Sequence, residues 1–477
     1  MNRMTILPAT LRCEWRILRR DPALWLTLAI LLACIAYALH NGLGALENRA
    51  HAVAEAKADE TRRLTELRQA VVRIESGAIP APDRPYRDPR NALAVGNNLG
   101  ANMAVLPPAP LAVIAIGLSD LHPPALRVGA GSKDGFLFAD EIANPGHLLA
   151  GSFDLAFVLV FVFPLCLLAL TYNLVSGERE QGTLALTAAC PVSMPAVLAG
   201  KLLVRGGVPL AVTLCAVNAS LAVVTAWPPE AMFWLSVSIM LYGLFWVALA
   251  AFVNALARDS AFNALALIAA WVFFLLLVPA LVNGVAVSLH PPPARAEMVL
   301  AVRSASVDIN RERDAQAARY RDEHPGADDA ALRRGSERER AQRRVAVQIA
   351  AAERADAVLA QHDAKLLRQH RLADRLSLAS PALLLNEVLV ELAGSGQGRH
   401  TAFLAQVDVF HLAWRQFFVS RAQDALLLSA TDYDAFPRFV FSEVLPSGFS
   451  GRLLLGQLAV GVMALMLFAL AARRVVR

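Results

Sequence analysis

The sequence predicts an all-α integral membrane protein with six transmembrane helices and a helix-rich extracytoplasmic domain. Three observations support this fold class: the 477-residue chain is 56% hydrophobic and only 18% charged, it contains six long apolar runs, and two long polar segments separate some of them. Soluble globular proteins contain about 45–50% apolar residues. The composition therefore indicates that much of the chain is surrounded by lipid.

The six apolar runs meet the requirement for a membrane-spanning helix, which is about 20 mostly apolar residues. They cover residues 22–43, 152–175, 202–226, 231–257, 260–288 and 453–472. The first run also resembles a secretory signal, because Ala36, Tyr37 and Ala38 match a cleavage site. We favour a span, since the region before it is long and contains the acidic residues Glu14 and Asp21.

Arginines flank the first and last runs, and basic residues mark the cytoplasmic side of a membrane protein. We therefore predict a multi-pass membrane protein with both termini in the cytoplasm. Residues 1–21 are expected to form an interfacial connector helix with Leu11, Trp15 and Leu18 toward lipid. Residues 452–477 are expected to form the sixth span and a cytoplasmic tail.

This orientation places residues 44–151 and 289–451 outside the cytoplasm, and residues 176–201 form a cytoplasmic loop before the third to fifth spans in 202–288. The first outer segment begins as a charged helix through about residue 76. The second is predicted to be a helical domain, with a long helix at 336–379 packed as a hairpin against a preceding helix.

Several classes of function are disfavoured by what the sequence lacks. It contains no P-loop, HExxH or GxSxG motif, and its five cysteines include no C-x-x-C pair. We therefore expect no catalytic residue, no metal site and no cofactor bound by this chain. The net charge of +5 does not arise from a basic cluster on one polar face, so a nucleic-acid partner is not expected.

The centres of all six runs contain no ionisable residue, whereas ion-coupled transporters place such groups at depth. The energy for any transport is therefore expected to come from outside the membrane domain. Pro164, Pro209 and Pro279 interrupt three of the runs, either as hinges or as ordinary kinks.

The most informative segment is SGEREQGTLALTAACPVSMPAVLAGK at residues 176–201. Glu178 and Glu180 end a helix, Gly182 permits a sharp turn, and TLALTAA is predicted to form a short helix capped by Thr183 and ended by Pro191. A short helix between two spans would transmit a push into both. An ordinary re-entry loop is the alternative.

This string resembles the signature of ABC-2 type transporter permeases, in which an acidic pair, Gly-Thr-Leu and a later proline precede a Gly-Lys that opens the next span. In that family the loop contains a coupling helix that docks in a cleft of the ATPase subunit. By position, the resemblance implies that the ATPase-coupling residues are Glu178, Glu180, Gly182, Thr183, Leu184 and Pro191. The N-terminal RILRRDPALW similarly resembles the connector helix of such permeases.

Three outer stretches, PPPARAEMVLAVRSA, SPALLLNEVLVELAGSG and DYDAFPRFVF, resemble a bacterial subgroup with large extracytoplasmic insertions and a domain-of-unknown-function label. The resemblance implies a non-catalytic permease subunit, with export as the favoured direction. Its implied partners are a separate ABC ATPase that uses ATP and Mg, a second permease, either a copy or a paralogue, and membrane lipid. The alternatives are an ATP-driven mechanotransmission or envelope scaffold complex, a membrane sensor and an integral membrane enzyme.

The topology predicts that residue 340 faces outward. In Arg340→Cys, an impermeant thiol reagent should label the new cysteine in intact cells whose outer membrane has been permeabilised, with the parent chain as control. Labelling that requires cell lysis would contradict the predicted orientation.

Overall fold

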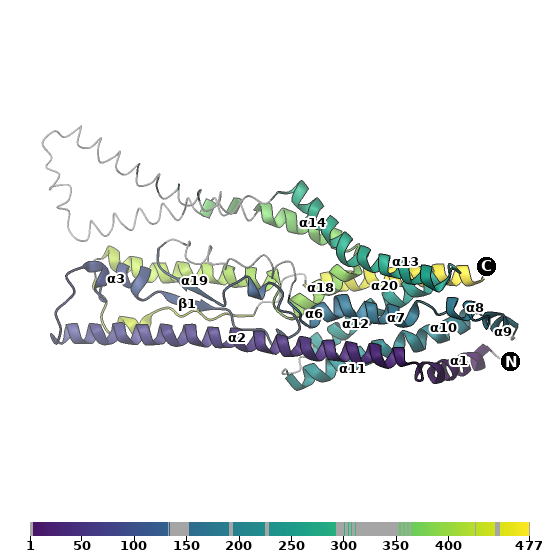
Figure 1. Cartoon of the computed structure of the whole chain (residues 1–477). Helices are drawn as coiled ribbons and strands as arrows, with labels where there is room; N and C mark the ends of the chain where they lie inside the picture. Colours follow the sequence, from purple (N-terminus) through teal and green to yellow (C-terminus); the bar gives the residue numbers. More distant parts are fainter. Residues whose placement is uncertain are drawn as a thin grey trace.

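The computed structural model describes residues 3–131, 133, 152–189, 194–224, 229–291, 364–424, 426–443 and 449–476, with single positions between 300 and 361. The molecule is elongated (Figure 1). A helical bundle forms one end and carries both chain termini. The other end, called here the distal domain, consists of the second half of α2, residues 76–131 and residues 397–443.

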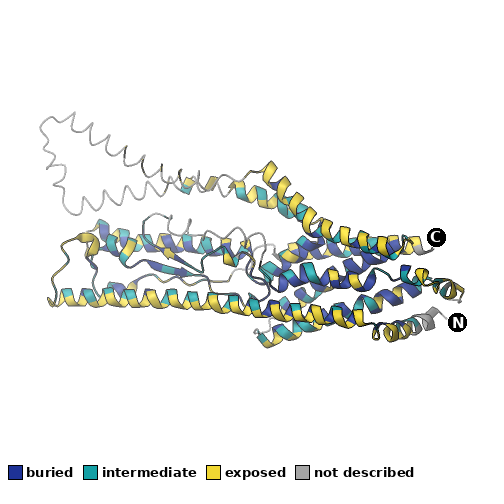
Figure 2. Cartoon of the chain, viewed as in Figure 1, coloured by how far each residue is buried: buried dark blue, intermediate teal, exposed yellow. Residues whose placement is uncertain are grey.

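Within the described residues, six helices are long and apolar enough to cross a membrane, which confirms the predicted number of hydrophobic helices. They are Pro22–Glu75, Leu155–Glu180, Met194–Val224, Pro229–Asn254, Ser260–Leu289 and Gly451–Arg474. Helix α12 (Pro229–Asn254) and the second span are the most buried of these six helices, and α12 packs against α20 (Phe449–Val476) and α7 (Phe163–Thr171). Figure 2 shows the resulting buried interior of the bundle.

Helix α2 (Pro22–Glu75) joins the first span and the charged helix that follows it into one element. Its 54 residues extend about 80 Å at 1.5 Å per residue. Asp21 caps the start, since its Oδ1 accepts a hydrogen bond from the Ala23 N–H at 2.9 Å. Leu31 is buried in the bundle and Val71 in the distal domain, so a single helix contributes to both cores.

The three prolines lie at breaks in their spans. In the second span, α6 (Leu155–Phe157) and the π-helical turn η4 (Val158–Val162) precede Pro164 in α7. In the fifth, α13 (Ser260–Val272) and the π-helical turn η5 (Phe273–Leu277) precede Pro279 in α14 (Val278–Leu289). Proline lacks an N–H and its ring clashes with the carbonyl four residues earlier, and a π turn relieves both problems.

The third span is also divided, into α10 (Met194–Arg205) and α11 (Gly207–Val224), with Pro209 in the first turn of α11. Helix α10 begins at Met194, before the predicted third span at 202–226. Lys201 therefore lies inside α10 and not at its start.

The N-terminal helix α1 (Arg3–Leu18) packs against α10. Leu18 is buried in a small cluster with Leu24, and Leu11 packs against the same cluster, whereas Trp15 is exposed. The expectation that all three side chains face lipid is therefore wrong for Leu11 and Leu18. Leu11 and Leu18 face protein, and Trp15 remains exposed.

The distal domain contains a short antiparallel sheet of β1 (Asn102–Val105) and β2 (Ala125–Val128), which the all-α prediction missed. Helix α19 (Gln397–Gln423) packs near α3 (Ala92–Ala94) and the π-helical turn η2 (Val95–Leu99). Trp414 of α19 is fully buried, and its Nε1 donates to Gly96 O at 3.0 Å. The distal domain also contains short 3-10 helices: η1 (Pro85–Arg87), η3 (Gly117–Asp120) and η6 (Asp432–Ala435).

Helix α18 (Pro381–Leu392) precedes α19 and packs against α12 and α20 of the bundle. Ser380 caps it by accepting from the Leu383 N–H at 3.3 Å, and the same hydroxyl donates to Phe274 O at 3.0 Å. Residues 364–377 are helical. Most of the predicted hairpin before them lies outside the described residues.

Candidate functional site

The segment between the second and third spans is built from two short helices at the end of the bundle that carries both termini (Figure 1). Helix α8 (Ser176–Glu180) follows α7 after a turn, and α9 (Leu184–Ala189) follows a second turn. In this second turn, Gly182 has φ +73°, the left-handed region that favours glycine. The Thr183 hydroxyl donates back to Glu178 O at 3.2 Å, which fixes the start of α9.

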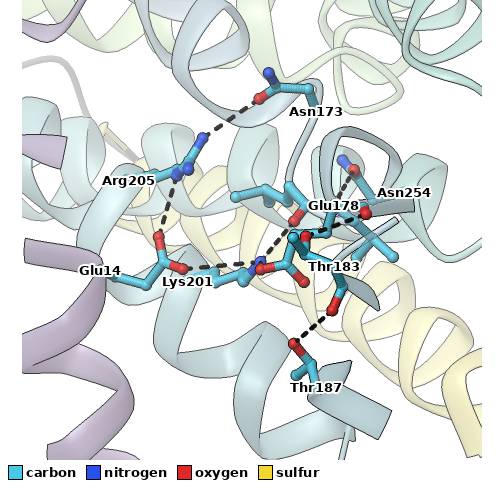
Figure 3. A network of polar contacts seen from close by, with 10 residues as sticks. Glu14, Asn173, Glu178, Thr183, Thr187, Lys201, Arg205 and Asn254 are labelled. Atoms are coloured by element: carbon cyan, nitrogen blue, oxygen red, sulfur yellow. Dashed lines mark hydrogen bonds and ion pairs between the residues drawn. The ribbon is translucent and has the colours of Figure 1, made fainter. Parts of the chain in front are cut away.

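A buried lysine anchors the base of this segment (Figure 3). Lys201 is only 4% exposed. Its Nζ lies 2.5 Å from Glu178 Oε1 and 3.7 Å from Glu14 Oε1, and it donates to Leu174 O at 3.0 Å. The contacts therefore join α1, the end of the second span and α10 around one charge.

A second cation completes the cluster. Arg205 Nε donates to Glu14 Oε2 at 3.4 Å, and its Nη1 donates to Asn173 Oδ1 at 3.3 Å. Two cations and two carboxylates thus balance one another, and burying them is tolerable only because each is paired and hydrogen-bonded. We call Glu14, Glu178, Lys201 and Arg205 the anchor cluster.

Polar contacts also attach α8 to the turn between α12 and α13. Glu180 Oε1 accepts from the Ser260 N–H at 2.7 Å, at the first residue of α13. Arg179 Nη1 donates to Ala257 O at 2.5 Å. The Ser260 hydroxyl donates to Ser176 Oγ at 2.8 Å. Helix α8 is therefore fixed on two sides, by α10 and by the start of α13.

Asn254, at the end of α12, extends this attachment into the bundle. Its Nδ2 donates to Thr171 O at 2.9 Å, and its Oδ1 accepts from the Val175 N–H at 3.3 Å. A single amide side chain thus satisfies backbone groups at the end of the second span. The second span and α12 are joined where the segment begins.

Beyond this fixed base, α9 projects from the bundle. Leu186 is 71% exposed, and Gln181, Gly182, Thr183 and Ala185 are also exposed. Leu186 is thereby displayed on a short helix whose base is attached to the bundle.

The predicted coupling residues therefore separate into two groups. The Glu178 and Glu180 carboxylates contact Lys201 and the Ser260 backbone, so they fix the base of the segment and do not extend from its tip. Gly182, Thr183 and Leu184 form the turn and the start of α9, which the sequence also predicted to be a short helix. Pro191 lies outside the described residues.

Sequence reasoning did not select Glu14, Arg205 or Asn254 as site residues. Arg205 and Asn254 are polar residues near the ends of apolar runs, and that position was the available signal, whereas Glu14 lies in the polar stretch before the first run. Their partners could not be identified from the sequence, because Glu14 and Arg205 are 191 positions apart.

Comparison with protein families gives one match outside this site. A family described as a domain of unknown function, DUF3526, matches residues 295–442 of the 477-residue chain. No curated protein matches the chain. The match covers α18 and α19 and supports the expected domain-of-unknown-function label for that segment, and the resemblance to ABC-2 permeases remains a prediction.

The anchor cluster predicts how the segment responds to mutation. If the ABC ATPase that the resemblance implies docks on this segment, Glu178→Ala and Glu180→Ala should weaken its association and the ATP hydrolysis of the complex, because α8 loses its contacts with Lys201 and α13. Gly182→Val should have the same effect, since a strained backbone position costs about 1–3 kcal/mol. ATPase co-purification and hydrolysis are the measurements.

The control is Glu337→Ala, a matched change in the predicted outer domain that should leave association unaltered. Association and hydrolysis are compared per inserted chain, because Glu178→Ala removes one of the two carboxylates that pair with the buried Lys201. Loop variants with unchanged association and hydrolysis would contradict the coupling role and favour the sensor or scaffold alternatives.

Proposed function

We propose that this chain is the permease subunit of an ATP-binding-cassette transporter of the ABC-2 type, acting as an exporter. The observation that carries the proposal is α9, an exposed short helix whose base is fixed to three spans and to α1. A separate ABC ATPase would dock on α9. Movement of α9 would then be passed to the spans through α8.

The need for a separate ATPase follows from the sequence, which contains no P-loop. ATP and Mg would be bound by that partner. A second permease, identical or paralogous, would complete the assembly, as the ABC-2 resemblance implies. The proposed location is the bacterial inner membrane, as the ABC-2 resemblance implies. Both termini and α9 would lie in the cytoplasm and the distal domain outside, because arginines flank the first and last apolar runs.

This proposal predicts that the purified chain alone hydrolyses no ATP. The complex isolated from the native membrane should contain an ABC ATPase, found by mass spectrometry, and should hydrolyse ATP. Robust hydrolysis by the chain after stringent removal of contaminating ATPases would contradict the proposal, as would a native complex without an ATPase.

A second candidate function, ATP-driven mechanotransmission or envelope scaffolding, is favoured by α2. This helix runs unbroken from the bundle through the distal domain, and at the junction Arg49 Nη1 donates to Ser119 O at 2.7 Å. A continuous helix with such contacts can move the distal domain when the bundle moves. The distal domain would then act on an envelope partner.

Gly44 provides a test of this second candidate, because it lies within α2 near the junction and a Cβ there would meet no atom within 4 Å. With spin labels at positions 66 and 281 in a cysteine-free background, ATP should change the interspin distance in the complex. Gly44→Pro should reduce that change, since an interior proline breaks helical hydrogen bonding. A distance that stays constant through the ATP cycle would argue against mechanotransmission.

A further inference from the structure

A cavity of about 450 Å³ lies between α10, α11, α12 and α20. We call it the α10–α20 groove. Its volume is in the range of sites that bind small molecules and cofactors. The lining residues include Leu198, Gly207, Val247, Phe468 and Ala472, and all of them are Leu, Ala, Val, Gly, Pro or Phe. The groove therefore offers surface for an apolar ligand and no lining side chain for a polar one.

The groove opens sideways from the bundle. Leu203 is 56% exposed and Ala472 is exposed, so the lining is accessible from outside the bundle. Both residues belong to helices that are candidates to cross a membrane. An opening of this kind faces lipid, and an apolar cavity binds apolar groups in preference to water.

One end of the groove is positively charged. Arg473 and Arg474 directly follow the lining residues Ala471 and Ala472 on α20, and both arginines are exposed. Among the described residues, no acidic side chain lines the groove. An apolar channel that ends at exposed basic residues matches a ligand with a hydrocarbon tail and an anionic head.

We propose that the α10–α20 groove binds an acyl chain of an anionic phospholipid whose phosphate contacts Arg473 and Arg474. The site requires only that the six helices cross a membrane, so it does not depend on the permease assignment. A second copy of this chain is the competing occupant of an apolar groove. The positive charge of Arg473 and Arg474 favours an anionic lipid over that second copy.

Two glycines make a matched pair of variants. A Cβ at Gly207 or at Gly284 would meet no atom within 4 Å, so neither position resists a side chain at its first atom. Gly207 lines the groove, and Gly284 lies in α14, outside it. Gly207→Leu should narrow the groove, and Gly284→Leu controls for a leucine added to a span.

The experiment uses the full chain in phosphatidylcholine vesicles that contain a minority of photoactivatable phosphatidylglycerol or, in parallel, photoactivatable phosphatidylcholine with the same acyl chains. Cross-linked peptides are mapped by mass spectrometry. The expected result is labelling of α10, α11 and α20 at the groove, with phosphatidylglycerol preferred. Gly207→Leu should lose most of this labelling with both lipids, and Gly284→Leu should keep it.

The double variant Arg473→Gln and Arg474→Gln tests the headgroup contact at exposed positions where folding is not at risk. Each basic residue near an anionic lipid contributes about fivefold in affinity, so losing two should lower the preference for phosphatidylglycerol by about 25-fold. Labelling by phosphatidylcholine should not change. Equal labelling of the wild type by both lipids, unchanged labelling of Gly207→Leu, or cross-links between two chains at the groove would overturn the proposal.

Discussion

The buried charge of Lys201 is the constraint on which the membrane end of this protein depends. An ammonium group removed from water is destabilising unless oxygens surround it, and here the oxygens come from Glu14, Leu174 and Glu178. These residues belong to α1, the end of the second span and α8. None of the three segments can move away from α10 alone without leaving a buried charge uncompensated. A short polar connection between two spans thereby becomes a rigid extension of the bundle, with only α9 projecting from it.

This rigid base is continuous with the rest of the molecule. Helix α1, which contributes Glu14, is followed by α2 after a short turn, where Trp25 Nε1 donates to Arg19 O at 2.9 Å. Helix α2 then enters the core of the distal domain through Val71. A displacement of α8 has a route of packed helices and hydrogen bonds to the far end of the chain. Energetic coupling along this route requires an element with two stable arrangements. The breaks at Pro164 and Pro279 are the places where the spans can adopt two arrangements.

Much of this architecture could be predicted from the sequence because each membrane span is a long run of consecutive apolar residues. The turn at Gly182 and the breaks at the three prolines were also predictable, since they follow from the conformational limits of single residues. The orientation of the Glu178 side chain could not be predicted, because the sequence of a polar loop does not show whether a carboxylate will contact water or a buried lysine. For the same reason, the apolar face of α1 was predicted, but its burial of Leu18 against protein was not. The sheet was missed because each strand is only four residues long, too short for alternation to be recognised.

Helix α10 connects the two sites described above. One face of α10 carries Lys201 and Arg205 in the anchor cluster, and the adjoining face carries Leu198, Ala199, Leu202 and Leu203 in the α10–α20 groove. Residues three apart on an α-helix differ by about 60°, so Leu198 lies next to Lys201 on the helix surface. A ligand that fits the groove in one position of α10 stabilises that position by mass action. By thermodynamic reciprocity, a partner on α9 that shifts α10 through the anchor cluster must then alter the affinity of the groove for its ligand by the same factor. The lipid and the ATPase that we propose would therefore be coupled through a single twelve-residue helix.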